Sequence, residues 1–387
     1  MENVGFVDQL KLRASAGVTG NSQIGNFVSR ALFGGGGEYF GGPAGGGVRS
    51  GFRPTQLGNP DLSWERAEQY NIGFDYALLT RRLRGSFNLY RNDTSDLLLF
   101  RPLPSSSGFN GRFQNVGTLR SEGIEIEVST INLDVGGFRW DTGFNLTLPR
   151  TEVIELVGDE DAIGSAFGRY EEGEPIEQYY FPKYAGVNPA DGRPFYYDED
   201  GNLTYLTQDA DRQNLGNNRP SLYGGLTNTF SYAGLTLDVF FQYDYGRTTF
   251  FNDGYFLDAP FTFNKRQEVA EESWSAPGQV TEYPKPYWFG FNPEEPVPQD
   301  SNFSFESGRW LEDASYIRLK NVRLGYTMPS SLTQNIGGVD ELTLFVQGTN
   351  LATWTNDYPG FDPETVGTDL GEYPQPKSYT AGINVGL

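Results

Sequence analysis

The sequence predicts an all-β protein that crosses a membrane as an antiparallel β-barrel. Two observations favour this fold class. Several segments alternate large apolar residues with small or polar ones, and the connectors between them alternate between long and short. The composition agrees, because Gly 49, Tyr 23 and Phe 29 among 387 residues are typical of many strands joined by turns. No apolar run reaches the length of about 18 residues that predicts a transmembrane helix.

The clearest alternation covers residues 70–78, where every even position is apolar or aromatic and every odd position is small or polar. A strand of this kind has one apolar and one polar face, which suits a place between lipid and a watery lumen. Residues 138–148 and 235–245 repeat the pattern, with Phe240 as the one large residue on the polar face. Residues 124–128, 342–348 and 381–387 are further strands of the same kind.

Four weaker segments complete the set, at residues 10–16, 83–90, 222–232 and 316–328. In the last of these, the apolar phase changes after Leu319, which predicts a β-bulge near Lys320 and Asn321. The sequence therefore predicts ten strands, most of them about the 9–11 residues that cross a bilayer at a tilt.

The connectors are long or medium at residues 19–63, 92–114, 149–220, 247–312 and 351–375, and short at residues 79–82, 132–137, 233–234 and 329–341. The two kinds alternate along the chain. Transmembrane barrels have short turns on the periplasmic side and longer loops outside. We therefore expect the long connectors outside and the C-terminus on the periplasmic side. A soluble β-sandwich is the alternative, although it requires no such alternation.

Composition also excludes several functions. The chain has no Cys and no His, so it has no disulfides, no zinc site built on these residues and no Cys- or His-based catalytic machinery. Its net charge of -21 argues against a nucleic-acid partner. The carboxylates of the alternating strands (Glu125, Glu127, Asp141, Asp238 and Asp244) are explained by a polar barrel wall, so we predict no catalytic residue, no cofactor and no enzymatic activity.

One connector is strongly acidic, with 15 Asp and Glu against three Lys and Arg over residues 152–211. This segment suits either a cation or basic partner, or simply a solvated acidic surface. Within it, Asp198, Asp200 and Asn202 offer oxygen atoms that Ca²⁺ prefers, and they are a weak calcium candidate. Because Asp200 is followed by a glycine between two aromatic-rich runs, an ordinary β-hairpin is the alternative.

Aromatic residues are concentrated in the connector 247–312. Their faces can stack on sugar rings or apolar side chains, so we name five as candidate substrate contacts: Trp274, Tyr283, Tyr287, Trp288 and Phe289. Packing of the loop against itself, or against a partner lid, is the alternative. The aromatic residues near strand ends (Tyr70, Trp140, Tyr245 and Tyr326) are expected in the girdles at the two membrane surfaces.

Several stretches, in order along the whole chain, resemble the barrel of TonB-dependent outer-membrane transporters of the SusC/RagA-like group. They are NPDLSWE at residues 59–65, SFNLYRNDTSDLL at 86–98, NVG at 115–117 with GIE at 123–125, AGVNP at 185–189 with DG at 191–192, WLEDASYIRLKNV at 310–322, and GTNL at 348–351 with YPGFDP at 358–363.

The resemblance implies an outer-membrane protein of a Gram-negative bacterium that imports oligosaccharides or peptides with a SusD-like lipoprotein. Such transporters have about 22 strands around a plug domain. The sequence shows ten strands, no signal peptide at its start and no plug domain, so residues 1–387 are expected to be the C-terminal part of the barrel. Contact with the TonB complex would be made by the missing N-terminal portion. The alternative function is a surface-exposed or secreted β-rich module that binds carbohydrate or acts as an adhesin.

Overall fold

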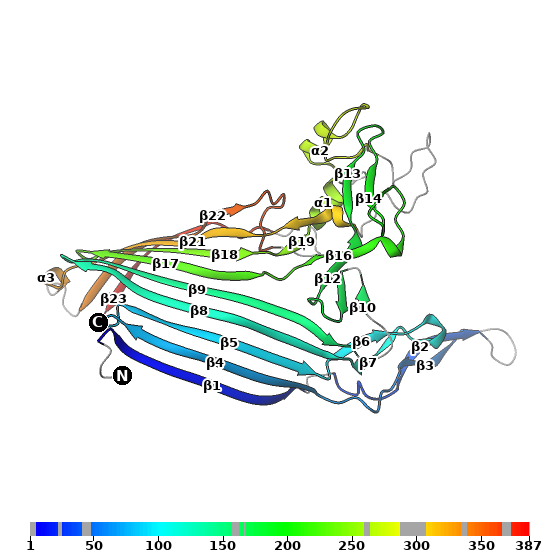
Figure 1. Ribbon diagram of the computed structural model, residues 1–387, viewed down its shortest axis with the longest axis horizontal. Coiled ribbons are helices and arrows are strands. Elements are labelled where there is room, and N and C mark those ends of the chain that lie inside the picture. Colours follow the sequence, from blue (N-terminus) through cyan, green and yellow to red (C-terminus); the bar gives the residue numbers. More distant parts are fainter. Residues whose placement is uncertain are drawn as a thin grey trace.

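The computed structural model describes residues 5–21, 25–40, 48–156, 162–165, 167–258, 264–286, 307–333, 339–365 and 373–386. Its largest unit is one antiparallel sheet of ten strands (Figure 1). In spatial order these strands are β1 (Val7–Asn21), β4 (Glu65–Leu78), β5 (Leu83–Ser95), β8 (Thr118–Val135), β9 (Phe138–Glu155), β17 (Leu222–Tyr232), β18 (Leu235–Tyr245), β21 (Tyr316–Thr327), β22 (Glu341–Thr355) and β23 (Ser378–Gly386). These are the ten strands that the alternation predicts, so the fold class is confirmed.

Several strands are longer than the alternation indicates. The segment predicted at 124–128 extends over all 18 residues of β8, and β9 is equally long. The extra residues at the loop end of both strands carry the ladder beyond the alternating apolar pattern, and they include both charged side chains such as Arg120 and buried apolar ones such as Val153. Apolar periodicity marks only the part of a strand that faces lipid, so it cannot detect this extension.

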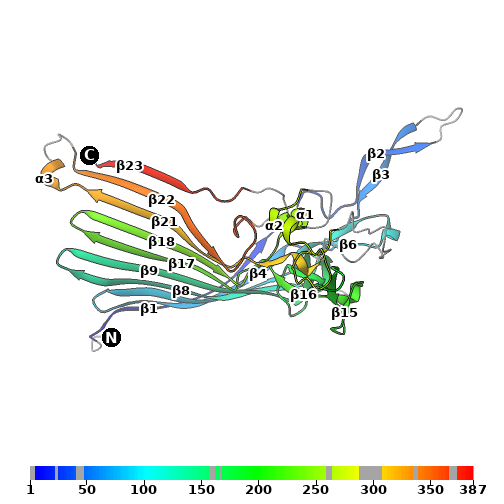
Figure 2. The same cartoon turned by 90° about the horizontal axis from the view of Figure 1, so that it is seen from above.

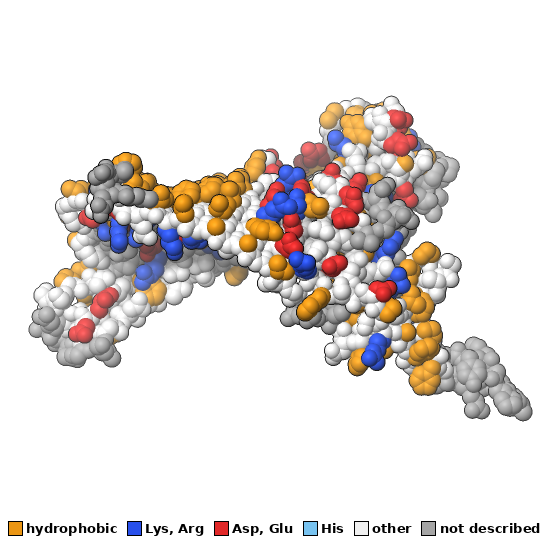
Figure 3. Space-filling view, turned by 60° about the horizontal axis from the view of Figure 1, so that its bottom comes forward, with side chains coloured by type: hydrophobic (Ala, Val, Ile, Leu, Met, Phe, Trp, Pro, Cys, Tyr) orange, Lys and Arg blue, Asp and Glu red, His pale blue; other side chains and the backbone are white. Residues whose placement is uncertain are grey.

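The register places the predicted apolar residues on one continuous face of the sheet. One row across five neighbouring strands reads Leu12, Phe74, Phe87, Ile126 and Leu146. The sheet is curved (Figure 2), and hydrophobic side chains follow one edge of the strand region beside a face that carries Lys and Arg (Figure 3). The row faces outward, toward lipid, and the opposite face lines the lumen.

The predicted girdle residues lie on the outward face, at opposite ends of its apolar band. Tyr70 and Tyr245 are at the loop ends of their strands, whereas Trp140 and Tyr326 are near the turns. The ring of Trp140 stacks on Phe230 of the next strand, with 5.7 Å between the ring centroids. Tyr and Trp prefer the two membrane surfaces, so their separation marks the height of the lipid-facing band.

Two irregularities in the pattern have local explanations. The pairing of β21 with β18 and with β22 shifts register at Lys320, which is the predicted bulge. Phe240, the large residue on the lumenal face, is paired with Thr227 of the neighbouring strand, and its ring lies over Gly225 of that strand. A Cβ atom built on Gly225 would be 2.6 Å from the Phe240 ring, so the glycine makes room for it.

The short connectors lie at one end of the sheet and the long ones at the other (Figure 1). The turn between β17 and β18 consists of Ala233 and Gly234, which both have positive φ. That between β8 and β9 is built on Gly136 and Gly137, also with positive φ. Both chain ends lie on the side of the short turns (Figures 1 and 2). This arrangement matches the predicted alternation.

The long connectors are folded rather than merely extended. They contain the hairpins β2 (Leu32–Phe40) with β3 (Val48–Gln56) and β6 (Leu98–Pro102) with β7 (Gly111–Asn115). They also contain a two-stranded sheet of β19 (Thr248–Phe250) and β20 (Leu311–Asp313), which are far apart in the chain. Two small sheets comprise β10 (Ala162–Ser165), β11 (Gly168–Glu171), β12 (Gln178–Pro182) and β16 (Arg212–Asn217), and β13 (Tyr184–Val187), β14 (Pro194–Tyr197) and β15 (Leu203–Thr204). The helices are α1 (Asn252–Asp258), α2 (Gln267–Glu272) and α3 (Ser330–Thr333).

The buried apolar clusters of the described residues lie in these connectors and at the loop end of β9. One joins Tyr179, Phe181, Phe250 and Trp310, and the other joins Val116, Val153, Leu156, Ile163 and Ile176. The sheet turns its own apolar side chains toward lipid, so the connectors supply the core. Within the described ranges, no helix is both long and apolar enough to span a membrane.

Candidate functional site

A cavity of about 500 Å³ opens among the long connectors, and we call it the loop cavity. It lies between the β13–β14 hairpin, α1, residues 281–283 and residues 309–312. Four aromatic side chains line it: Tyr184, Phe251, Tyr283 and Trp310. The volume falls within the range of about 300–1,000 Å³ that is usual for small-molecule sites.

Charged groups of both signs share this lining. The Arg266 Nε donates to an Asp258 oxygen at 2.7 Å, and a second guanidinium N–H donates to the other oxygen. Arg266 also lies 5.5 Å from the Phe251 ring centroid, and Arg309 lies 4.4 Å from that of Trp310. Both cations therefore contact aromatic faces, which holds their side chains in place. A cavity of this kind suits a ligand that has both apolar faces and hydrogen-bonding groups.

Glu312 is the most strongly perturbed carboxyl group of the loop cavity. It is held in the β19–β20 pair opposite Thr249, and it also borders a second cavity of about 450 Å³. Burial, together with the negative charges of Glu282 and Asp258 and against the positive charge of Arg266, raises the pKa of Glu312 to about 7. Near neutral pH, the carboxyl group is therefore present both as a hydrogen-bond donor and as an acceptor.

Among the predicted contacts, Tyr283 lines the loop cavity. Trp274 is only 7% exposed, its indole Nε1 donates to the Pro189 carbonyl at 3.0 Å, and its ring fills the space beside Gly192. Its backbone N–H also donates to the Tyr283 carbonyl at 2.9 Å, so Trp274 positions Tyr283 and presents little surface to a ligand. Tyr287, Trp288 and Phe289 lie outside the described residues.

Sequence reasoning missed most of the loop cavity. Tyr184 lies more than 120 residues from Arg309 and Glu312 in the chain, and no local spacing connects it to them. Trp310 stands in a stretch that resembles the family, but nothing in that stretch indicates that its side chain faces a cavity. The local signal that could be read was the density of aromatic residues in the connector 247–312, and it identified Tyr283.

The calcium candidate forms a hairpin loop between β14 and β15. Oδ1 of Asp198 accepts hydrogen bonds from the backbone N–H groups of Asp200 at 3.0 Å and Asn202 at 2.7 Å. The Asn202 side chain donates to the other Asp198 oxygen at 3.3 Å. These bonds close the turn, as the hairpin interpretation predicts. Among the described residues, no group of three or more metal-ligating side chains occurs.

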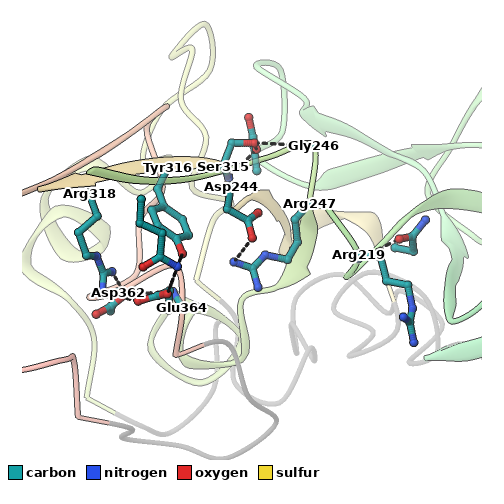
Figure 4. Close-up of polar contacts among 12 residues, drawn as sticks. Arg219, Asp244, Gly246, Arg247, Ser315, Tyr316, Arg318, Asp362 and Glu364 are labelled. Carbon is teal, nitrogen blue, oxygen red and sulfur yellow. Dashed lines mark hydrogen bonds and ion pairs between the residues drawn. The ribbon is translucent and has the colours of Figure 1, made fainter. Parts of the chain in front are cut away.

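A second polar cluster fixes the connector between β22 and β23 to the lumenal wall, and we call it the lumenal latch (Figure 4). Arg318 of β21 is 1% exposed and donates to Asp362 and, at 2.5 Å, to Glu364. Tyr316 and Gln242 donate to the other oxygen of Glu364 at 2.7 and 2.9 Å. This part of the connector is therefore held against the inner face of β18 and β21.

The electrostatics of the latch favour its charged state. Burial alone would raise the pKa of Glu364, but the hydrogen bond from Tyr316 and the positive charges of Arg318 and Lys320 outweigh it and hold the pKa below its ordinary value. Backbone groups add to this order, because Asp362 accepts from the N–H groups of Glu364 at 2.9 Å and Gln375 at 3.0 Å. Nearly all the charged and polar groups of the latch are thus joined in ion pairs or hydrogen bonds.

Comparisons with known proteins agree with this architecture. Residues 3–164 match the family model described as TonB dependent receptor-like, beta-barrel. The chain is 31% identical to TonB-dependent receptor P3 of Formosa agariphila over 97% of its length and 25% identical to TonB-dependent receptor SusC of Bacteroides thetaiotaomicron over all of it. A solved structure of the RagAB peptide transporter superposes with a TM-score of 0.83 and 28% identity over 99% of this chain.

Over nearly its whole length, the chain is similar to TonB-dependent receptors, which form outer-membrane β-barrels. Within that class, the similarity extends to SusC and to the RagAB peptide transporter. The chain spans 39% of the P3 receptor, 38% of SusC and 41% of the RagAB chain.

Proposed function

We propose that this chain forms part of the wall and outer mouth of a TonB-dependent importer that takes up oligosaccharides or peptides. The observation that carries the proposal is the pairing of a lipid-facing, ten-stranded sheet with a folded set of connectors at its outer end. A soluble carbohydrate-binding module or adhesin would not turn a continuous row of apolar side chains to the surface, because water would make that face costly.

The loop cavity is the proposed contact for substrate. Its aromatic faces suit sugar rings or apolar peptide side chains, and its Arg and carboxylate groups suit hydroxyl, amide or terminal charged groups. Tyr283 is the residue that both the sequence and the cavity favour. Tyr287, Trp288 and Phe289 remain proposed contacts of the same connector.

A SusD-like lipoprotein is the proposed partner above this mouth, since the similarity extends to SusC and to RagAB. The TonB complex is proposed to supply energy through the portion of the transporter that precedes this chain. Affinity purification from outer membranes tests the lipoprotein partner: we expect a lipoprotein to co-purify in near-equal amount, and its absence under mild detergent would contradict the proposal.

Uptake in cells that lack the transporter tests the function. Restoring the complete transporter should restore import of at least one labelled oligosaccharide or peptide, and an uncoupler should abolish it. Tyr283→Ala should lower uptake about tenfold at limiting substrate, whereas Tyr373→Ala, which removes a ring that is 92% exposed, should not. Equal losses in both variants would contradict a substrate role for the loop cavity.

A further inference from the structure

The outward face of the sheet carries a block of charges directly beyond its apolar band. It occupies the loop ends of four neighbouring strands, and we call it the charged belt. Its members are Arg66 and Glu68 of β4, Arg91 and Asp93 of β5, Arg120 and Glu122 of β8, and Arg150 and Glu152 of β9.

The register fixes the side of the sheet on which the belt lies. One row reads Tyr70, Arg91, Glu122 and Arg150 across the four strands. Two residues further toward the apolar band, the row contains Ile72, Leu89, Ile124 and Leu148, where the alternating apolar series of these strands ends. Since side chains two apart on a strand share a face, the belt points outward and not into the lumen.

The depth of the belt follows from strand geometry. On β9, the outward apolar series runs from Phe138 to Leu148, which spans about 34 Å along the strand and about 26 Å along the membrane normal at a tilt of about 40°. This height equals the apolar band of about 25 Å that outer-membrane barrels present to lipid. Arg150 stands two residues beyond Leu148, about 5 Å further out, at the level of the lipid headgroups.

Each strand of the belt carries one Arg and one acidic residue, and the acidic Glu68 and Asp93 lie opposite each other. These charges are only partly paired within the protein. The Arg120 Nε donates to Asp93 at 2.8 Å, where Arg91 also pairs at 2.7 Å, and Arg150 pairs with Glu152 at 2.6 Å. The Arg91 and Arg150 side chains nevertheless remain 45% and 67% exposed. A guanidinium that is paired on one edge still has N–H donors for an outside acceptor.

The opposite arc of the sheet differs at its loop end. There, the outward positions carry exposed aromatic and aliphatic residues, among them Tyr245, Ile317 and Trp354. Aromatic side chains are ordinary at a membrane surface, whereas eight charges on four strands are specific to the arc from β4 to β9. The belt is therefore a local surface with its own partner and not a general feature of the barrel rim.

We propose that the charged belt binds phosphate-bearing glycolipid headgroups of the outer leaflet. Arg66, Arg91 and Arg150 match phosphate oxygens, because a guanidinium can donate to two of them at once. The carboxylates of Glu68 and Glu122 face the same layer and match the divalent cations that hold neighbouring phosphates together. The Arg and acidic groups of the belt thus complement the phosphates and the divalent cations of the headgroup layer.

Lipid binding to the complete transporter tests this proposal. Delipidated protein in detergent is titrated with synthetic diphosphoryl lipid A, with and without Mg²⁺, and bound molecules are counted by native mass spectrometry. Each Arg removed should weaken binding about fivefold, so Arg91→Gln with Arg150→Gln should weaken it by about 25-fold. Phosphatidylcholine should bind all variants equally.

The matched control is Arg13→Gln, which removes the same charge from the lumenal face, where Arg13 pairs with Asp75 at 2.7 Å. It should bind lipid A like the unaltered protein. If the double variant does not fold, Arg150→Gln alone suffices, since this side chain is the more exposed of the two. Unchanged binding in the belt variants, or an equal loss in Arg13→Gln, would overturn the proposal. A change of oligomer mass with unchanged lipid binding would assign the belt to a second copy of the protein instead.

Discussion

Phe144→Arg tests the lipid-facing assignment most directly. Phe144 lies six residues from Phe138 on β9, about 16 Å along the membrane normal and within about 3 Å of the middle of the apolar band. Arg at this depth should cost about 2–4 kcal/mol of barrel stability. The substitution also removes the stacked contact with Tyr243, whose ring centroid is 6.2 Å away. This loss adds about 0.5–1.5 kcal/mol to the cost. The expected total is about 3–5 kcal/mol.

The control is Asn145→Arg on the same strand. Asn145 lies on the lumenal face opposite Glu127, so the new cation has water and a carboxylate beside it and should cost little. Phe144→Leu separates the terms, because it removes only the aromatic contact. The assay is the temperature at which the barrel of the complete transporter loses its compact migration in detergent gels, together with its amount in the outer membrane. Equal losses in Phe144→Arg and Asn145→Arg would refute the assignment of the two faces.

Three further predictions concern other parts of the molecule. On whole cells, an impermeant thiol reagent should label Asp200→Cys in the long connector and not Ala233→Cys in the short turn; the reverse pattern would invert the topology. Arg318→Met should lower the free energy of unfolding by about 3–5 kcal/mol, because it leaves Asp362 and Glu364 without their buried cation. The loss should appear as a lower unfolding temperature and faster proteolysis of the 356–377 connector. The same change at Arg219, whose pair with Glu177 is nearly half exposed, should cost less than about 1 kcal/mol. Glu312 binds its proton more tightly in the folded state, with a pKa of about 7 against an ordinary value of 4.5. Its contribution to stability is therefore complete below about pH 4.5 and is lost as the pH rises to about 7. In Glu312→Gln, the free energy of unfolding should not fall with pH over this range.

The membrane part of the fold could be predicted because lipid imposes a strict rule on sequence. Each strand must turn one face to hydrocarbon, so apolar residues recur at every second position and the number of strands can be counted. The same rule located the bulge at Lys320, where the apolar phase changes. It could not give the length of β8 or β9, because beyond the membrane the ladder continues with side chains of any polarity.

The candidate site could be predicted only in part, because it is assembled by tertiary contacts. Tyr283 was identified from the density of aromatic residues, and Trp274 was named on the same grounds although it is buried and donates to the Pro189 carbonyl. Aromatic composition does not distinguish a ring that lines a cavity from a ring that supports one. The lumenal latch was missed for a similar reason, since Arg318 lies 44 residues from its partner Asp362.

The distribution of buried side chains bears on how such a mouth can bind a ligand. The sheet turns its apolar side chains toward lipid and its polar side chains toward the lumen, so it has no core of its own to stabilise the connectors. Packing among Phe181, Phe250 and Trp310, together with the ion pairs of Arg318, supplies that order instead. A cavity lined by residues that are already fixed loses little conformational entropy when a ligand enters. For this reason, a substitution that loosens these supports should weaken binding at the loop cavity without touching a residue that lines it.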